Sequence, residues 1–507
     1  MEKTTPFDIP LLINEICQYL SRKDLTRCVL VSKTWAAWFT PTLWRDLDCG
    51  RVIPDALTFS GQREHIRVMR GFPMWISRTT RELLPSLHLQ RLEFRDSSGI
   101  PNTHRAEIRV LPLLERIPTL QHLQISLSLG HDNVCQQWIQ TLAGLSRLES
   151  LSLKCDEFVD GKVIQDILRL CHRLERLSLD IPKDEYDMEE ENRQEYRDTK
   201  TVIERMPEMR LRELSFPSGV LSFDSNIPIV EENIFQPLLG RCPRMEKLDL
   251  GWINQESTLQ HLSKVLKNNK LPRLRHFIIG RLRESHFQEA LVEALSHVEC
   301  GIESLVFPDE PRDSVIQSLI QHHSRSLTTL NFNCSISLCE FSTLMAGLPN
   351  LRSFRSTIKV DRYSRDIPDK HWECHELRIL RLDLYGLGDG IFDGSTWGEP
   401  TTKRQLDYVF SEVAKLTSLQ VLILGDNVKD LYLNRHKYLT QLANLKQLKV
   451  FDLAKISHKA FGKQEALWMV KNWPKLLQVY ARNAPVTFKE ILQEKRPLIE
   501  VLNQGYR

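Results

Sequence analysis

One short apolar pattern recurs fourteen times between Leu89 and Arg482. Each copy has an apolar residue, two other residues, a second apolar residue, one other residue and usually a third apolar residue, as in Leu148–Leu153 and Leu174–Leu179. The copies lie about 30 residues apart on average, which is a spacing typical of solenoid repeats. In a solenoid, each strand-and-helix unit buries its apolar side only against its neighbours. The long surface that results favours binding of a macromolecule over catalysis.

Composition narrows the classes of partner. The 507 residues are 41% hydrophobic and 26% charged, with a net charge of only +3, which favours neither nucleic acid nor an anionic membrane. No apolar run approaches the roughly 18 to 20 residues of a membrane span, and Met1–Pro10 shows no apolar segment typical of a secretory signal. The eleven cysteines are scattered, as expected for reduced thiols. We therefore expect an intracellular protein, in the cytoplasm or nucleus, with no membrane or nucleic-acid partner.

A different unit precedes the repeats. Apolar residues recur at helical spacing in 10–20, and Pro10 suits the first turn of a helix. Residues 21–24 break the pattern before a second short apolar stripe. Ser32 is placed to cap a third helix that carries Trp35 and that we expect Pro41 to end. Three helices in about 40 residues bury little surface alone, so such a unit usually needs a neighbour or a partner.

The residues of this unit resemble an F-box. The sequence contains Ile9-Pro10 before a Leu/Ile-rich helix, then Lys23-Asp24-Leu25, then Val31-Ser32-Lys-Thr-Trp35, in the order of that family. Two departures are visible: Leu11 and Leu12 follow the proline where many members have an acidic residue, and Ser32 stands where Cys is common. An F-box followed by leucine-rich repeats is itself a known arrangement.

The resemblance implies a function. F-box proteins dock onto the SKP adaptor of a cullin-RING (SCF) ubiquitin ligase and present a bound substrate for ubiquitin transfer. An apolar anchor of this kind matches the usual chemistry of interface hot spots. In small amphipathic helices one apolar stripe can serve as the core and as a partner interface, so the same residues could instead be the core of the three-helix unit. The adaptor-binding positions that the resemblance implies are Ile9, Pro10, Ile13, Ile16, Leu20, Leu25, Val31 and Trp35.

Strand alternation predicts which repeat residues face a partner. The fourth and sixth positions of each copy should point into the core, and the residues between and beside them should point to the concave surface. Ile278 and Val306 make a small apolar pair there, and a second group is rimmed by arginine. A covering loop or tail, or simple strand propensity, would explain the same residues. The candidate substrate-binding residues are Arg355, Ile379, Arg381, Val421, Ile423 and Val450, with Trp397 from the long interval between positions 380 and 422.

The sequence shows no recognisable motif for catalysis, nucleotide binding or metal binding. The glycines of 386–390 lack the spacing of a dinucleotide loop, and residues 394–398 have serine in the wrong place for a nucleophile elbow. None of the best metal candidates has paired ligand spacing; these are Cys334 with Cys339, His322 with His323, and His371 with Cys374 and His375. We expect a protein that is not an enzyme and has no cofactor and no metal.

These observations predict an α/β fold: a leucine-rich-repeat solenoid, a horseshoe of parallel strands and helices, preceded by a small three-helix F-box. The expected boundaries are 7–47 for the F-box, 48–86 for a linker or degenerate first repeat, 87–482 for the solenoid and 483–507 for a carboxy-terminal cap or tail. The expected function is substrate recognition in an SCF ubiquitin ligase, with the SKP adaptor, a cullin and a protein substrate as partners. The alternative is a non-catalytic scaffold whose first helices only cap the solenoid.

Overall fold

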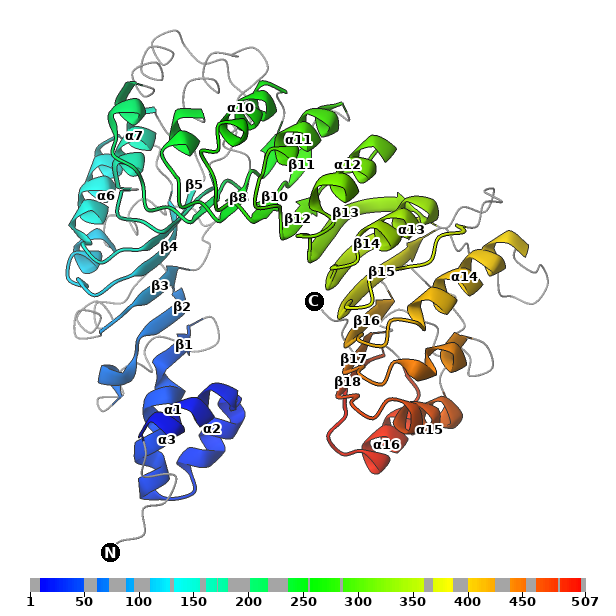
Figure 1. The fold of residues 1–507 in the computed structure, drawn as a ribbon. Coiled ribbons are helices and arrows are strands. Elements are labelled where there is room, and N and C mark those ends of the chain that lie inside the picture. The colour runs from blue at the N-terminus through cyan, green and yellow to red at the C-terminus, as the bar shows by residue number, and fades with distance from the viewer. Residues whose placement is uncertain are drawn as a thin grey trace, which may run out of the picture. The chain divides into compact units, whose positions relative to one another are not determined.

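The computed structural model describes sixteen stretches of the chain, which fall into two compact units, residues 1–245 and 246–507. Figure 1 shows the ribbon. The described residues are 10–49, 62–72, 88–94, 110–127, 132–155, 161–170, 172–180, 201–217, 236–253, 256–282, 286–359, 368–385, 400–424, 438–452, 462–481 and 484–502.

The amino-terminal unit begins with three helices and continues as a parallel sheet. The sheet runs from β1 to β7, each strand pairing with the next in parallel, and α6 and α7 connect its later strands. Its elements are α1 (Pro10–Tyr19), α2 (Arg22–Val29), α3 (Lys33–Arg45), β1 (Asp46–Asp48), the 3₁₀ turn η3 (Arg63–His65), β2 (Val68–Phe72), β3 (Arg91–Phe94), β4 (His122–Leu127), α6 (Asp132–Gly144), β5 (Ser150–Cys155), α7 (Gly161–Leu170), β6 (Arg176–Asp180) and β7 (Glu213–Ser215).

The carboxy-terminal unit consists of parallel strands backed by helices. Its ladder runs β8, β10 and β12 to β19, and the short pair β9–β11 stands apart. Its elements are β8 (Lys247–Asp249), β9 (Trp252–Ile253), α10 (Glu256–Lys267), β10 (His276–Ile278), β11 (Arg281–Leu282), α11 (Phe287–Ser296), β12 (Ser304–Phe307), α12 (Asp313–His323), β13 (Thr329–Ser337), α13 (Leu338–Gly347), β14 (Ser353–Lys359), β15 (Ile379–Tyr385), α14 (Pro400–Val413), β16 (Val421–Leu424), the 3₁₀ turn η6 (Leu442–Asn444), β17 (Val450–Asp452), α15 (Lys463–Asn472), β18 (Gln478–Tyr480), α16 (Val486–Lys495) and β19 (Glu500–Leu502).

The burial pattern explains why the repeated motif forms these strands. In β5, Leu151 and Leu153 are buried and the residues on either side of each are half-buried, which is the alternation of a sheet with one packed face. The register places the fourth position of one repeat beside the fourth position of the next, as Leu330, Phe354 and Leu380 show. The predicted α/β leucine-rich-repeat fold is therefore confirmed in each unit, as is the helical module before it.

The ends of the sheets differ in detail from the expected pattern. We expected Pro41 to end the third helix, whereas α3 continues to Arg45 because Leu43, beyond the proline, packs on the core of the helical module. The ladder also has strands outside the fourteen recognised copies, namely β1 and β2 before them and β19 after them. β1 and β19 have one leucine each, Leu47 and Leu502, and β2 has none, so backbone pairing rather than the full apolar motif identifies these strands.

Aromatic side chains fill the middle of the carboxy-terminal core. Phe307, Phe332 and Phe354 follow one another on β12, β13 and β14 with ring centroids 5.9 and 6.2 Å apart. Phe341 of α13 joins them to Trp372, whose ring lies 4.9 Å away in an edge-on arrangement. Such pairs bury large apolar areas and add about 0.5–1.5 kcal/mol each beyond burial. This column is the support behind the central strands.

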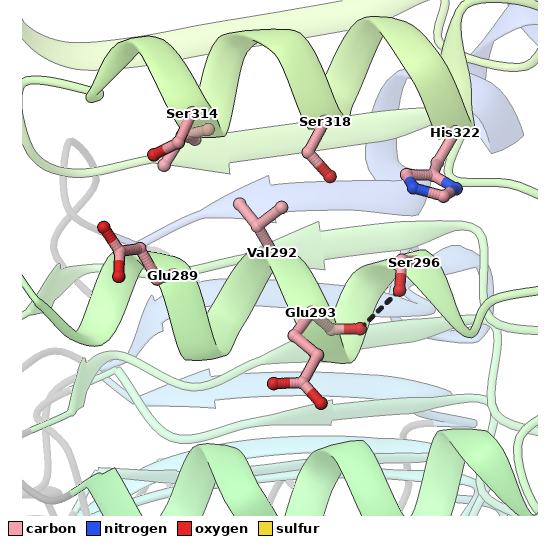
Figure 2. A pocket seen from close by; sticks show the side chains of 8 residues that line it. Glu289, Val292, Glu293, Ser296, Ser314, Ser318 and His322 are labelled. Atoms are coloured by element: carbon pink, nitrogen blue, oxygen red, sulfur yellow. Dashed lines mark hydrogen bonds between the residues drawn. The ribbon is translucent and has the colours of Figure 1, made fainter.

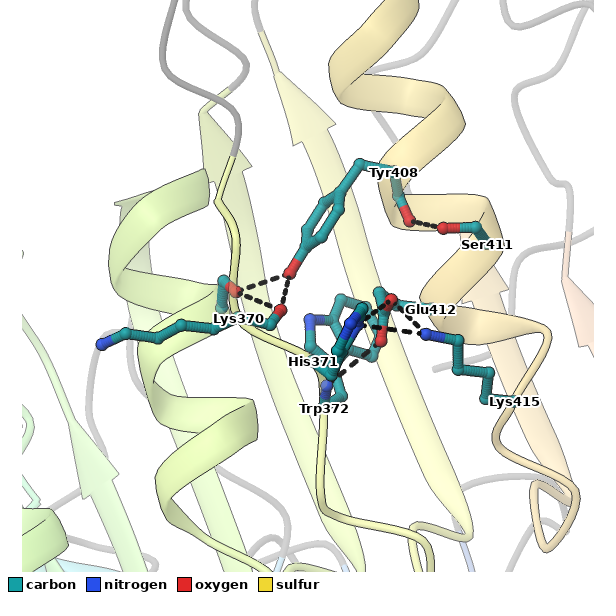
Figure 3. A network of polar contacts seen from close by, with 8 residues as sticks. Lys370, His371, Trp372, Tyr408, Ser411, Glu412 and Lys415 are labelled. Atoms are coloured by element: carbon teal, nitrogen blue, oxygen red, sulfur yellow. Dashed lines mark hydrogen bonds and ion pairs between the residues drawn. The ribbon is translucent and has the colours of Figure 1, made fainter.

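A polar network fastens α14 behind the same strands (Figure 3). The buried carboxylate of Glu412 accepts hydrogen bonds from the Trp372 backbone N–H at 3.1 Å and from the Lys415 ammonium, and contacts His371 Nδ1 at 3.1 Å. Burial acts to raise the pKa of Glu412, but these hydrogen bonds together lower it below its usual value. The Tyr408 hydroxyl meanwhile donates to the Lys370 carbonyl. The network thus holds residues 370–372 against α14.

His323, at the end of α12, makes stability depend on pH. Its ring is buried, and Nδ1 accepts a hydrogen bond from the Ile302 N–H at 3.3 Å. Burial first, and His322 second, lower its pKa from 6.5 to about 4, against a hydrogen bond to Leu295 that raises it. At pH values between these two pKa values, the His323 imidazole binds a proton in the unfolded chain but not in the folded one. The free energy of unfolding therefore falls as the pH is lowered, by at most about 1.4 kcal/mol per pH unit.

We expect His323→Gln to flatten this pH dependence. Urea unfolding of the full chain, followed at pH 7, 6 and 5, should show a loss of about 2 kcal/mol at pH 5 in the wild type that is absent in the variant. The matched control is His322→Gln, because His322 is the exposed neighbour on the same helix. Equal slopes for wild type and His323→Gln would contradict the prediction.

Candidate functional site

The amino-terminal helices form a module with its own core. Ile13, Cys17, Leu25 and Phe39 are buried together, and six partly buried apolar side chains pack around them: Leu20, Cys28, Val29, Trp35, Trp38 and Leu43. The rings of Trp35 and Phe39 lie 5.2 Å apart. All of these residues come from α1 to α3 and the turns between them, so the module has an apolar core of its own.

Serine caps define where two of the helices begin. The Ser21 hydroxyl accepts a hydrogen bond from the Asp24 N–H at 3.2 Å, and Ser32 does the same for Trp35 at 3.1 Å. Each cap satisfies one backbone donor at a helix start and is worth about 1 kcal/mol. Ser21 also donates to the Asp24 carboxylate at 2.6 Å, and this hydrogen bond lowers the pKa of Asp24. The caps therefore hold the two turns that connect the three helices.

Several large apolar side chains of the module face solvent. Leu30 is 80% exposed and Val31 is 62% exposed in the turn between α2 and α3. On α1, Leu12 and Tyr19 are exposed with half-buried Ile16 between them, a spacing that puts all three on one side of the helix. Exposed apolar groups concentrated on one small module are typical of a binding surface. We call these five residues the exposed apolar set.

The structure divides the predicted adaptor residues into two groups. Ile13 and Leu25 lie in the core of the module, and Leu20 and Trp35 pack against it. Ile16 and Val31 belong to the exposed apolar set. Ile9 lies outside the described residues, and Pro10 begins α1 while its side chain is not described.

The sequence analysis missed Leu12, Tyr19 and Leu30 as candidates for this surface. Leu12 and Leu30 were visible as apolar residues beside the core stripes, but a helical pattern alone does not say which of two adjacent apolar stripes meets the other helices. Tyr19 lies seven residues after Leu12, which was the available signal.

The module joins the repeats through its third helix. Among the described elements, α3 contacts both β1 and η3, and β1 follows it without a break. The core of the module is made from α1, α2 and α3 themselves, and the exposed apolar set lies on α1 and on the turn before α3. The geometry therefore attaches the module at one helix and leaves its other apolar surface uncovered within the described part of the chain.

The second candidate surface is the strand face, meaning the face of the carboxy-terminal sheet opposite the buried fourth and sixth positions. Register pairing places Ile379, Val421 and Val450 side by side on β15, β16 and β17. Ile379 is 41% exposed and the two valines are half-buried. Two residues further along β15, Arg381 pairs with Arg355 of β14. The structure therefore brings these five predicted residues together.

Two predicted residues do not join this group as expected. Ile423 is only 4% exposed, although it occupies the same register row as Arg381, so its side chain is not available at the surface. Its neighbour in that row, Asp452, is also buried. Trp397 lies outside the described residues. The smaller expected pair, Ile278 and Val306, is half-buried, and the two residues are direct register partners on β10 and β12.

The structure also contains a shallow hollow of about 260 Å³ between α11 and α12 (Figure 2). Glu289, Val292 and Ser296 of α11 lie opposite Ser314, Ser318 and His322 of α12 across it, and Glu293 also lines it. Within the described residues, no hydrogen bond joins His322 to a serine hydroxyl, and Ser296 donates instead to the Glu293 carbonyl at 2.7 Å. We assign no chemistry to this hollow.

The predicted metal candidates do not assemble a site. Across the described stretches, no three His, Cys, Asp or Glu side chains are grouped so as to hold a metal ion. Burial raises the pKa of Cys334 and of Cys374 to about 12, so both thiols stay protonated and are poor ligands. His371 instead contacts Glu412 in the network of Figure 3.

Comparison with known families agrees with the module that the structure shows. Residues 12–50 match the family model described as F-box-like. The chain joins an F-box-like segment to leucine-rich repeats. An F-box joined to such a scaffold is the architecture of an F-box adaptor or substrate receptor, and proteins of this kind are typically non-catalytic. In the described part of this protein, no helix is both long and apolar enough to cross a membrane.

Solved structures with similarity to this protein are distant in sequence. One chain in the crystal structure of the Rad7 and Elc1 complex in yeast is 14% identical, over 98% of this chain and 92% of that chain, with a TM-score of 0.42. The leucine-rich-repeat protein LegL7 from Legionella pneumophila is 13% identical over 62% of this chain and 89% of that chain, with a TM-score of 0.35. A comparison with curated proteins finds no match. The fold assignment rests on the strand ladders described above.

Proposed function

We propose that this protein is the substrate-recognition subunit of an SCF-type cullin-RING ubiquitin ligase. Its F-box docks the SKP adaptor, and through the adaptor a cullin, while the repeats bind a protein substrate. The protein itself makes and breaks no bond. Its contribution is to hold the substrate close to a ubiquitin-charged enzyme, which turns an encounter between two molecules into a reaction within one complex.

One observation carries the proposal: the F-box buries one apolar stripe as its own core and leaves a second one exposed. Ile13 and Leu25 are already used inside the module, so they support the fold of the surface rather than contact a partner. Leu30 and Val31 are exposed side by side, and exposing them to water costs about 1.5–3 kcal/mol each relative to burial. A partner that covers them recovers that free energy.

The test is capture of the SKP adaptor by the full chain. Leu30→Asp/Val31→Asp should reduce adaptor capture at least about tenfold while leaving the circular dichroism spectrum unchanged, because charges at a desolvated contact are costly and both residues lie outside the core. Leu498→Asp is the matched control, since Leu498 is a leucine of similar exposure (84%) near the other end of the chain.

The alternative function makes the opposite prediction. If the helices only cap the solenoid, folded wild-type protein will not capture the adaptor at all. If the double variant captures as much adaptor as the wild type does, the adaptor contact does not use Leu30 and Val31.

A further inference from the structure

Three polar side chains stand in one register row on the strand face. Asn331 of β13 pairs with Arg355 of β14, and Arg355 pairs with Arg381 of β15. Parallel strands lie about 4.8 Å apart, so the three side chains leave the sheet as close neighbours on the same face. We call these residues the arginine row.

The arginine row lacks the partners that its chemistry requires. Within the described residues, neither guanidinium has an ion pair or hydrogen bond, and two atoms are buried without a partner, Arg381 Nε and Asn331 Oδ1. Two like charges directly opposite on adjacent strands destabilise a sheet. A buried N–H without an acceptor adds to this cost. An anion bound between the two guanidinium groups would relieve the repulsion between them.

Nearby acidic groups do not fill that role. Asp383 lies on the same strand as Arg381, and Asp452 lies two strands away in the same row. Each of these carboxylates already has an interaction of its own. The other groups that face the row on β13 to β15, Ser353, Thr329 and Thr357, are uncharged. The strand face is therefore cationic at this point.

An apolar row runs beside the cationic one. Ile379, Val421 and Val450 are in register across β15, β16 and β17, two residues before the row that contains Arg381. A ligand that lies across the strands can therefore place an anionic group on the arginines and an apolar group on these three side chains.

We propose that this face binds an extended acidic peptide segment of the substrate. An Asp or Glu carboxylate takes a position between Arg355 and Arg381, and a neighbouring apolar side chain packs on Ile379, Val421 and Val450. A singly charged carboxylate suits the site better than a doubly charged phosphate. Arg381 is half-buried beside apolar residues, and the cost of desolvation rises with charge. This inference rests on the proposed function, because it describes the substrate of the same receptor.

The test uses three degenerate nine-residue peptide libraries, each with a fixed central pair. The pairs are Glu-Leu, Gln-Leu and phosphoserine-Leu, and the flanking positions exclude Asp and Glu. Retention on the immobilised full chain should be about tenfold higher for Glu-Leu than for Gln-Leu, since charge-assisted hydrogen bonds to arginine are roughly twice as strong as neutral ones. Arg355→Gln/Arg381→Gln should abolish the difference.

A matched control separates position from net charge. Arg325→Gln/Arg404→Gln removes the same two positive charges from exposed sites in the turn after α12 and in α14, and it should leave the preference intact. Equal retention of the Glu and Gln libraries, stronger retention of the phosphoserine library, or equal effects of the two double variants would each overturn the proposal.

Parallel adaptor capture separates the two hypotheses. If the full chain captures the adaptor but shows no preference for the Glu-Leu library, only the assignment of the acidic segment is overturned. If the full chain prefers the Glu-Leu library but never captures the adaptor, the ligase function is overturned and the peptide site stands.

Discussion

Trp372→Ala is expected to lower the free energy of unfolding of the carboxy-terminal unit by about 3–5 kcal/mol, the usual cost of removing a fully buried tryptophan. Trp372 is almost completely buried, with its ring against Phe341 at 4.9 Å and Tyr408 at 6.5 Å. Its backbone N–H also donates to Glu412. The loss should therefore loosen α13 and α14 together, and it should appear as faster hydrogen exchange in both helices and in β14 and β15.

The control for this prediction is Trp372→Phe, which keeps an aromatic ring against Phe341. It should cost less than half as much, because less volume is removed and the Glu412 network uses only the backbone N–H of this residue. If the rate of hydrogen exchange in α14 is the same in Trp372→Ala as in the wild type, α14 is held by other contacts.

Phe39→Ala is expected to unfold the amino-terminal module while the repeats stay folded. Phe39 is 1% exposed and is the largest side chain at the centre of the module core. Its truncation should cost about 3–5 kcal/mol, which is comparable to the entire stability of many small domains. Limited proteolysis should then cut within residues 10–45, and adaptor capture should be lost with it.

Protease resistance distinguishes Phe39→Ala from the surface variant, because the two should lose adaptor capture for different reasons. Leu30→Asp/Val31→Asp should lose the adaptor and remain resistant to protease, whereas Phe39→Ala should lose both. Phe39→Leu, which keeps most of the apolar volume, should preserve both. Protease resistance of Phe39→Ala equal to that of the wild type would contradict the assigned core.

Much of the architecture followed from local pattern alone. The spacing of leucines such as Leu151 and Leu153 requires a strand with one buried face, and recurrence at about 30 residues requires neighbouring strands to lie in register. The F-box was visible for a similar reason, since its Asp24-Leu25 turn and Trp35 helix lie close together in the chain. Such features depend on residues a few positions apart, so a linear motif can reveal them.

The surfaces were harder to read because exposure depends on residues far apart in sequence. Strand alternation places both Ile423 and Ile379 on the strand face, but Ile423 is buried whereas Ile379 is exposed. In the F-box, Ile13 and Leu12 are adjacent apolar residues, and packing of α1 on α3 decides that Ile13 is core. The pairing of Arg355 with Arg381 across 26 residues is likewise a consequence of register.

The amino-acid order thus specified the repeats and the helical module, because periodic burial is encoded within each short segment. Packing between segments decided which apolar side chains became core and which stayed exposed. It also decided where two unpaired arginines meet, since strands distant in the chain come within about 4.8 Å only once the sheet has formed.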